Sequence, residues 1–155
     1  QSGNVHIAQQ YYQRVLQLYP QDTHAQVGFI NTLDNRSLNS ESQLKLLKEQ
    51  MPESAYIHFS LGNFYASLGQ WAQAQQAYFE ALRYDNNQAD YAYNLAVSLD
   101  QMNQPRVALS YYQKAIQLAQ NKPIHFNLPA AQKRVQTLRS HTRASALANL
   151  PSQNF

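Results

Sequence analysis

The chain has 155 residues, of which 44% are hydrophobic and 14% are charged, and its formal net charge is +3. This length suits one compact domain or a short array of repeats, and the apolar content is enough to form a core. The absence of cysteine excludes disulfides, thiolate metal sites and cysteine nucleophiles. No apolar run approaches the roughly 18 residues of a membrane-spanning helix. Glycine is scarce, so the composition favours helices.

The charges are unevenly distributed along the chain. Asp100 is the last acidic residue, and every Asp, Glu, Lys or Arg after it is basic: Arg106, Lys114, Lys122, Lys133, Arg134, Arg139 and Arg143. A basic C-terminal end could approach an acidic protein, nucleic acid or anionic lipid. The alternative is an ordinary solvated face, and the low density of these charges favours it over phosphate binding.

Apolar residues recur at spacings of three and four in the first third of the chain, a period that predicts helices. The predicted ranges are 4–19, 23–34 and 40–50. Pro20 ends the first of these helices, Asp22 can cap the second, and Ser40 can open the third as part of a capping box. The first helix has no preceding partner here. We therefore expect the chain to be a piece of a longer protein, whose earlier part could carry a signal or an anchor.

The same period continues to the C-terminal region. It predicts helices over 55–67, 71–84, 88–101, 105–121 and a last one within 127–140. Gly69 fits a helix C-terminus, and Pro105 suits the first turn of its helix. Residues 141–155 lack an apolar period and contain Pro151, so we predict a flexible tail after a domain that spans 1–140.

Two consecutive segments repeat one pattern of core positions. The first copy contains His58, Leu61, Gly62, Tyr65, Ala74, Tyr78 and Ala81, and the second contains Ala92, Leu95, Ala96, Leu99, Ala108, Tyr112 and Ala115. In such a pattern, small residues lie where two helices cross closely and large ones fill the gaps between neighbouring pairs. The chain thus resembles the tetratricopeptide repeat proteins, whose unit is a helix-turn-helix of about 34 residues.

The resemblance divides the chain into repeat units. Pro20 and Pro52 fall where earlier repeats close, and Leu44 and Leu47 occupy core positions of a shortened one. The units are a half repeat (4–22), a degenerate repeat (23–54), two good repeats (55–88 and 89–122) and a capping helix (127–140). The face of Ala131, Val135 and Leu138 should cover the last pair. The implied fold is all-α, a right-handed superhelix of antiparallel helix pairs with a C-terminal capping helix.

In this family the first helices line a concave groove that binds peptides, and catalysis is not expected. The family's groove positions correspond here to Asn31, Tyr56, Phe59, Asn63, Tyr93, Asn94, Val97 and Gln101. Members that bind chaperone tails use two asparagines, at the positions of Asn63 and Asn94, to hold a peptide. An asparagine amide both donates and accepts, which suits a peptide backbone.

The basic residues of that carboxylate clamp are missing. Phe59, Ile124 and Leu128 stand where lysine or arginine is expected. We therefore predict an internal peptide segment, held by the asparagines and by the pockets of the aromatic residues, rather than a free C-terminus. In the alternative interpretation, the asparagines pair within the protein and the aromatic residues pack on the terminal helix.

Other chemistry has little support in the sequence. The histidines are scattered without a ligand spacing, no glycine-rich phosphate loop occurs, and no carboxylates are paired for acid–base work. We predict no enzymatic activity, no cofactor and no small-molecule substrate.

Three classes of function compete. The segment DYAYNLAVSLDQMNQPRVALSYYQKAIQLAQ, with the basic terminal helix, resembles the repeat region of bacterial proteins for type IV pilus or secretion-system assembly. This favours the cell envelope, periplasmic or inner-membrane associated, over the cytoplasm, with membrane contact only through a preceding segment. The alternatives are a cytoplasmic chaperone or regulatory adaptor and a nucleic-acid-associated protein that uses the basic end. The partner and the oligomeric state stay open.

Overall fold

The computed structural model describes residues 2–33, 38–120 and 123–148, and every regular element in those ranges is a helix. The helices are α1 (Ser2–Leu18), α2 (Thr23–Thr32), α3 (Leu38–Gln50), α4 (Ala55–Ser67), α5 (Trp71–Tyr84), α6 (Ala89–Gln101), α7 (Pro105–Leu118) and α8 (Leu128–Ala148). The chain divides into two compact units, 1–86 and 87–155, which we call unit 1 and unit 2. None of the described helices is both long and apolar enough to cross a bilayer.

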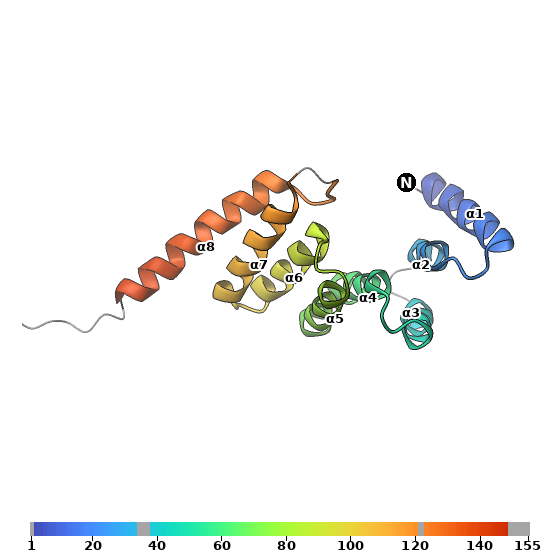
Figure 1. The fold of residues 1–155 in the computed structure, drawn as a ribbon, viewed down its shortest axis with the longest axis horizontal. Coiled ribbons are helices and arrows are strands. Elements are labelled where there is room, and N and C mark those ends of the chain that lie inside the picture. The colour runs from blue at the N-terminus through green and yellow to red at the C-terminus, as the bar shows by residue number, and fades with distance from the viewer. Residues whose placement is uncertain (1, 34–37, 121–122, 149–155) are drawn as a thin grey trace, which may run out of the picture. The chain divides into compact units, whose positions relative to one another are not determined.

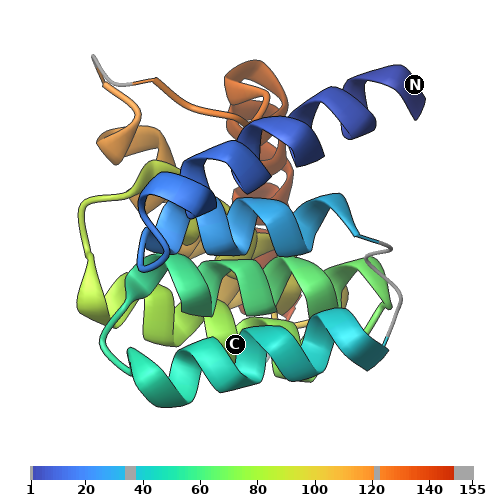
Figure 2. The same cartoon turned by 90° about the vertical axis from the view of Figure 1, so that its right-hand side faces the viewer.

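Unit 1 contains α1 to α5 (Figure 1). Helix α2 packs against α1, α3 and α4, while α4 pairs with α5. Figure 2 shows α1, α2, α4 and α3 one below another, running roughly side by side. Their shared core is a single cluster of aliphatic and aromatic side chains: Val27, Ile30, Leu44, Leu47, Ile57, Leu61, Phe64 and Ala77. Burial of this cluster is the main source of the unit's stability.

Unit 2 consists of α6, α7 and α8. Helices α6 and α7 form one hairpin, and α8 lies along α7 (Figure 1). Ala131, Val135 and Leu138 are buried, as the sequence predicts for a helix that covers the last pair. The Asn127 side chain accepts a hydrogen bond from the Ala130 N–H at 2.9 Å and so caps the first turn of α8.

The predicted repeat register agrees with the burial of the side chains. All the residues of the two repeat copies are buried except Tyr65, which is half-buried. The turns inside the two hairpins also match. Gly69 has a φ of +71°, and Asn103, at the equivalent place in the next repeat, has a φ of +56°. Asparagine is among the few residues that enter this left-handed region readily, so it can replace glycine in the second turn.

Several local predictions need correction. Helix α8 continues to Ala148, so residues 141–148 are helical and the predicted tail does not begin at 141. This stretch is rich in alanine, the strongest helix former, which explains the extension without an apolar period. Residues 149–155 lie outside the described ranges. Helix α3 begins at Leu38, so Ser40 is inside its first turn and buried rather than at the cap.

Candidate functional site

The predicted groove residues of unit 1 lie on the two first helices, α2 and α4. Asn31 is exposed near the end of α2. On α4, the half-buried Tyr56 stacks on His24 of α2, with ring centroids 4.7 Å apart and planes at 23°. Burial raises the pKa of the Tyr56 hydroxyl, so it stays neutral. Phe59 is half-buried and packs against Tyr78 at 5.7 Å. The two helices thus present half-exposed aromatic surfaces.

Asn63 has a structural bond that the sequence does not reveal. The Tyr78 hydroxyl donates to the Asn63 side-chain oxygen at 2.8 Å, across the α4–α5 hairpin. Tyr78 is buried, and that burial raises the pKa of its hydroxyl well above the ordinary value. Asn63 itself is exposed. The Asn63 side-chain oxygen therefore helps to hold α4 against α5, although the residue itself lies at the surface.

The predicted residues of unit 2 lie on α6. Asn94 and Val97 are half-buried, and Gln101 is exposed at the end of the helix. Tyr93 is held by two rings. Phe126 stacks on it with centroids 4.3 Å apart and planes at 5°, and Tyr112 meets it edge-on at 5.7 Å. Tyr93 thus packs on the segment that leads into α8, whereas the alternative interpretation placed such packing on the terminal helix itself.

The segment between α7 and α8 also pairs with Asp90 in the first turn of α6. The His125 backbone N–H donates to one Asp90 carboxylate oxygen at 2.8 Å, and His125 Nδ1 lies 2.8 Å from the other. Ile124, which stands where the family's clamp has a basic residue, lies in this non-helical segment because α8 starts only at Leu128. In this protein, the clamp position that Ile124 occupies is therefore not on a helix.

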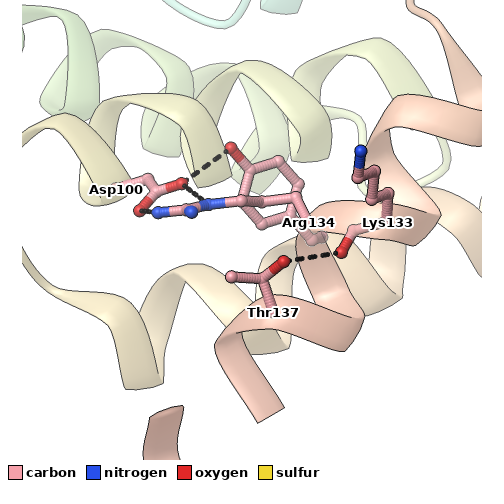
Figure 3. Close-up of polar contacts among 5 residues, drawn as sticks. Asp100, Lys133, Arg134 and Thr137 are labelled. Atoms are coloured by element: carbon pink, nitrogen blue, oxygen red, sulfur yellow. Dashed lines mark hydrogen bonds and ion pairs between the residues drawn. The ribbon is translucent and has the colours of Figure 1, made fainter. Parts of the chain in front are cut away.

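The other end of α6 is tied to α8 by an ion pair. Arg134 donates to both carboxylate oxygens of Asp100, from Nε at 2.6 Å and from Nη2 at 2.7 Å (Figure 3). The buried Tyr112 hydroxyl donates to the same carboxylate at 3.2 Å. Hydrogen bonding to Asp100 raises the pKa of Arg134. Burial, reinforced by the Asp100 charge, raises the pKa of Tyr112. A bidentate pair of this kind fixes the relative orientation of the two side chains in addition to attracting them.

Arg134 therefore does not lie on a free basic face. Figure 3 shows its side chain directed at Asp100, while the neighbouring Lys133 points elsewhere and its carbonyl accepts from the Thr137 hydroxyl at 3.2 Å. With the Gln113 amide turned so that its oxygen faces Arg139, the Arg139 guanidinium can donate to that oxygen, at the edge of a cleft of about 480 Å³ between α7 and α8. Among the described residues, no group of three histidine or carboxylate side chains is placed to hold a metal ion.

The structure brings the predicted residues together in two sets. In unit 1, Asn31 lies on α2, and Tyr56, Phe59 and Asn63 share α4. In unit 2, Tyr93 shares α6 with three others. One groove lined by both sets stays a prediction. The sequence missed the contacts of Asp90 with His125 and of Tyr93 with Phe126. The only signal for them was the non-helical spacing between the repeat and the capping helix.

Comparison with known proteins identifies the repeats. Residues 57–90 and 89–122 each match a family model described as tetratricopeptide repeat. No curated protein sequence matches the chain.

Solved structures share the fold at low sequence identity. A crystal structure of MamA is 20% identical with a TM-score of 0.69, covering 90% of this chain and 80% of that one. PcrH, in complex with the chaperone binding region of PopD, is 23% identical with a TM-score of 0.62, covering 84% and 94%. The Yersinia enterocolitica type III secretion translocator chaperone SycD is 18% identical with a TM-score of 0.63, covering 83% and 86%.

Proposed function

We propose that this tetratricopeptide repeat protein is a non-catalytic scaffold that binds an extended or helical segment of a partner protein on the first helices of its repeats. The observation that carries the proposal is the half-exposed aromatic surface of α4. Tyr56 and Phe59 remain partly open to solvent, although Leu61, Ala74 and Tyr78 already fill the repeat core. Aromatic side chains that keep one face open are typical anchors for a partner.

The partner we propose is a segment of a secreted or envelope-assembled protein. One of the similar structures is the type III secretion translocator chaperone SycD, and PcrH is in complex with the chaperone binding region of PopD. They support a role in bacterial secretion, pilus or envelope assembly. The same structures favour, as a second candidate, a chaperone that holds its partner before assembly. Nucleic-acid binding has less support, because the charge of Arg134 is already paired with Asp100.

Site-specific photo-cross-linking in the producing cell tests the surface. A photoreactive phenylalanine analogue at Tyr56 should cross-link to a partner protein, because this position lies on a first helix. The matched control is Phe79, an aromatic residue of α5 that is 45% exposed on the second helix of the same hairpin. Equal cross-linking from both positions, or cross-linking from Phe79 alone, would contradict the proposed surface.

Substitution of Asn63 needs a control of its own. Asn63→Ala would remove both a groove amide and the acceptor of the Tyr78 hydroxyl, so lost binding could follow from a disturbed hairpin. Tyr78→Phe removes the same hydrogen bond and keeps the Asn63 amide. Weaker partner binding in Asn63→Ala, with normal binding in Tyr78→Phe, is the result we expect from a peptide-binding asparagine.

A further inference from the structure

We infer that the Asp90–Tyr93 face of α6 is a subsite for a basic residue followed by an aromatic residue, and that the chain's own His125–Phe126 pair occupies it. We call this face of α6 the Asp90–Tyr93 subsite, and we call His125 and Phe126 the resident pair. The inference rests on the proposed function, because it assigns one part of a first helix to a defined feature of the partner. All of these residues belong to unit 2.

The geometry of the resident pair defines what the subsite recognises. The two oxygens of Asp90 take one backbone N–H and one ring nitrogen, both at 2.8 Å, from the same residue. The next residue lays its ring flat on Tyr93 at a centroid distance of 4.3 Å. A carboxylate that accepts from a backbone N–H and from the side chain of the same residue fixes the direction of a peptide and favours a basic residue at that place. Lysine or arginine would satisfy the same carboxylate.

We expect the subsite to keep its shape without the resident pair, because Tyr93 has a second contact besides Phe126. Tyr112 packs edge-on against its ring at 5.7 Å, and Tyr112 is itself buried and bonded to Asp100. Removing Phe126 should therefore leave an aromatic face open rather than collapse the site. Such a rigid aromatic platform beside a carboxylate is suited to an incoming aromatic side chain.

The polar half of the resident pair, His125, can leave at small cost, and a partner's own aromatic residue would replace the stacking of Phe126 on Tyr93. The His125 side chain is 88% exposed, so its contact with Asp90 is open to solvent and contributes little. Helix α8 has separate attachments in Ala131, Val135 and Leu138 and in the Arg134–Asp100 bond. Because the pair is tethered close to its subsite, it competes as an intramolecular ligand with a high effective concentration. A partner segment must displace it.

A peptide added in trans tests the inference. The probe is the acetylated and amidated peptide of residues 123–128, Pro-Ile-His-Phe-Asn-Leu, titrated by NMR into the full chain. We expect it to bind the double variant His125→Ala, Phe126→Ala at least about tenfold more tightly than the wild type, because the tethered competitor is gone. Adding Tyr93→Ala or Asp90→Asn to the double variant should abolish the gain. Helical circular dichroism of each variant confirms that it is folded.

The specificity is tested on the same variant. Replacing the peptide's histidine by lysine should preserve binding, whereas glutamate at that position or alanine in place of phenylalanine should abolish it. Equal affinity for the wild type and the folded double variant, no binding to the double variant, or indifference to Asp90→Asn would overturn the inference. Cross-linking at Tyr56 depends on unit 1 alone. If that cross-link forms and the peptide result fails, the subsite is refuted and the scaffold is not.

Discussion

Replacing Gly62 by alanine should destabilise unit 1, whereas the same replacement at Gly28 should not. Both glycines are buried on first helices, Gly28 in α2 and Gly62 in α4. A Cβ on Gly62 would lie 2.4 Å from Cδ1 and Cε1 of Tyr78 and 3.0 Å from its Cγ. These atoms are near the root of the ring. Because Tyr78 is buried and its hydroxyl is bonded to Asn63, the ring has little room to move.

At Gly28 the clash involves the far end of a side chain instead. A Cβ there would meet Cζ and Cε1 of Tyr12 at 2.4 and 2.5 Å and its hydroxyl oxygen at 2.9 Å. Tyr12 is only half-buried, so a small rotation about its χ angles can move the tip of its ring outward. The same methyl group therefore meets a fixed obstacle in one helix and a movable one in the other.

Two terms set the expected size of each effect. Alanine is favoured over glycine inside a helix by about 0.8–1 kcal/mol, and both variants receive this gain. Overpacking a well-filled core costs about 1–3 kcal/mol, and only Gly62→Ala incurs that cost in full. We expect Gly62→Ala to lower the free energy of unfolding by about 1 kcal/mol and Gly28→Ala to leave it unchanged or raise it by up to about 1 kcal/mol.

Urea unfolding followed by helical circular dichroism measures both changes. Comparing the two variants removes the helix-propensity term, since it is common to both. Shifts of the same sign and size, or a Gly62→Ala variant more stable than the wild type, would refute the argument that the fixed Tyr78 ring decides the outcome.

Two further predictions concern unit 2 and the buried tyrosines. Arg134→Ala should lower the free energy of unfolding by about 1 kcal/mol, because it leaves the partly buried Asp100 without its charged donor. The exposed control Arg143→Ala should change the free energy of unfolding little. Equal urea midpoints for the two variants would contradict this prediction. Burial raises the pKa of Tyr78 and Tyr112, so the folded state keeps these protons to higher pH than the unfolded chain, and stability should fall as the pH rises beyond about 10. In an absorbance titration we expect a late tyrosinate phase that coincides with loss of helical signal, and complete reversible ionisation near pH 10 without unfolding would disprove it.

The sequence predicted the helices and the repeat register well, because each repeat contact is local. Gly62, Ala74 and Tyr112 occupy positions where two adjacent helices cross, and the regular length of the repeat fixes those crossings whatever the rest of the chain does. The bounds of α4 and α5 agree with the prediction for the same reason. The end of α8 was wrong because alanine supports a helix without leaving an apolar period.

The candidate site was less predictable, since its residues have partners that no spacing reveals. The family's groove positions located Tyr56, Asn63 and Tyr93 on first helices. They did not show that Asn63 accepts a hydrogen bond from the Tyr78 hydroxyl or that Tyr93 stacks on Phe126. Each of these contacts depends on the direction of a side chain, and several rotamers are compatible with any one repeat register.

The sequence by itself therefore determined an all-α array with its core positions, because helix propensity and apolar period act within a few residues. Only the tertiary structure decided which polar and aromatic groups meet. Asp100 bonds to Arg134 and Asp90 to His125, and in each pair the two partners are far apart in the sequence. Such pairs form only after the hairpin and α8 have packed together, because that packing sets both the distance and the direction between the charged groups.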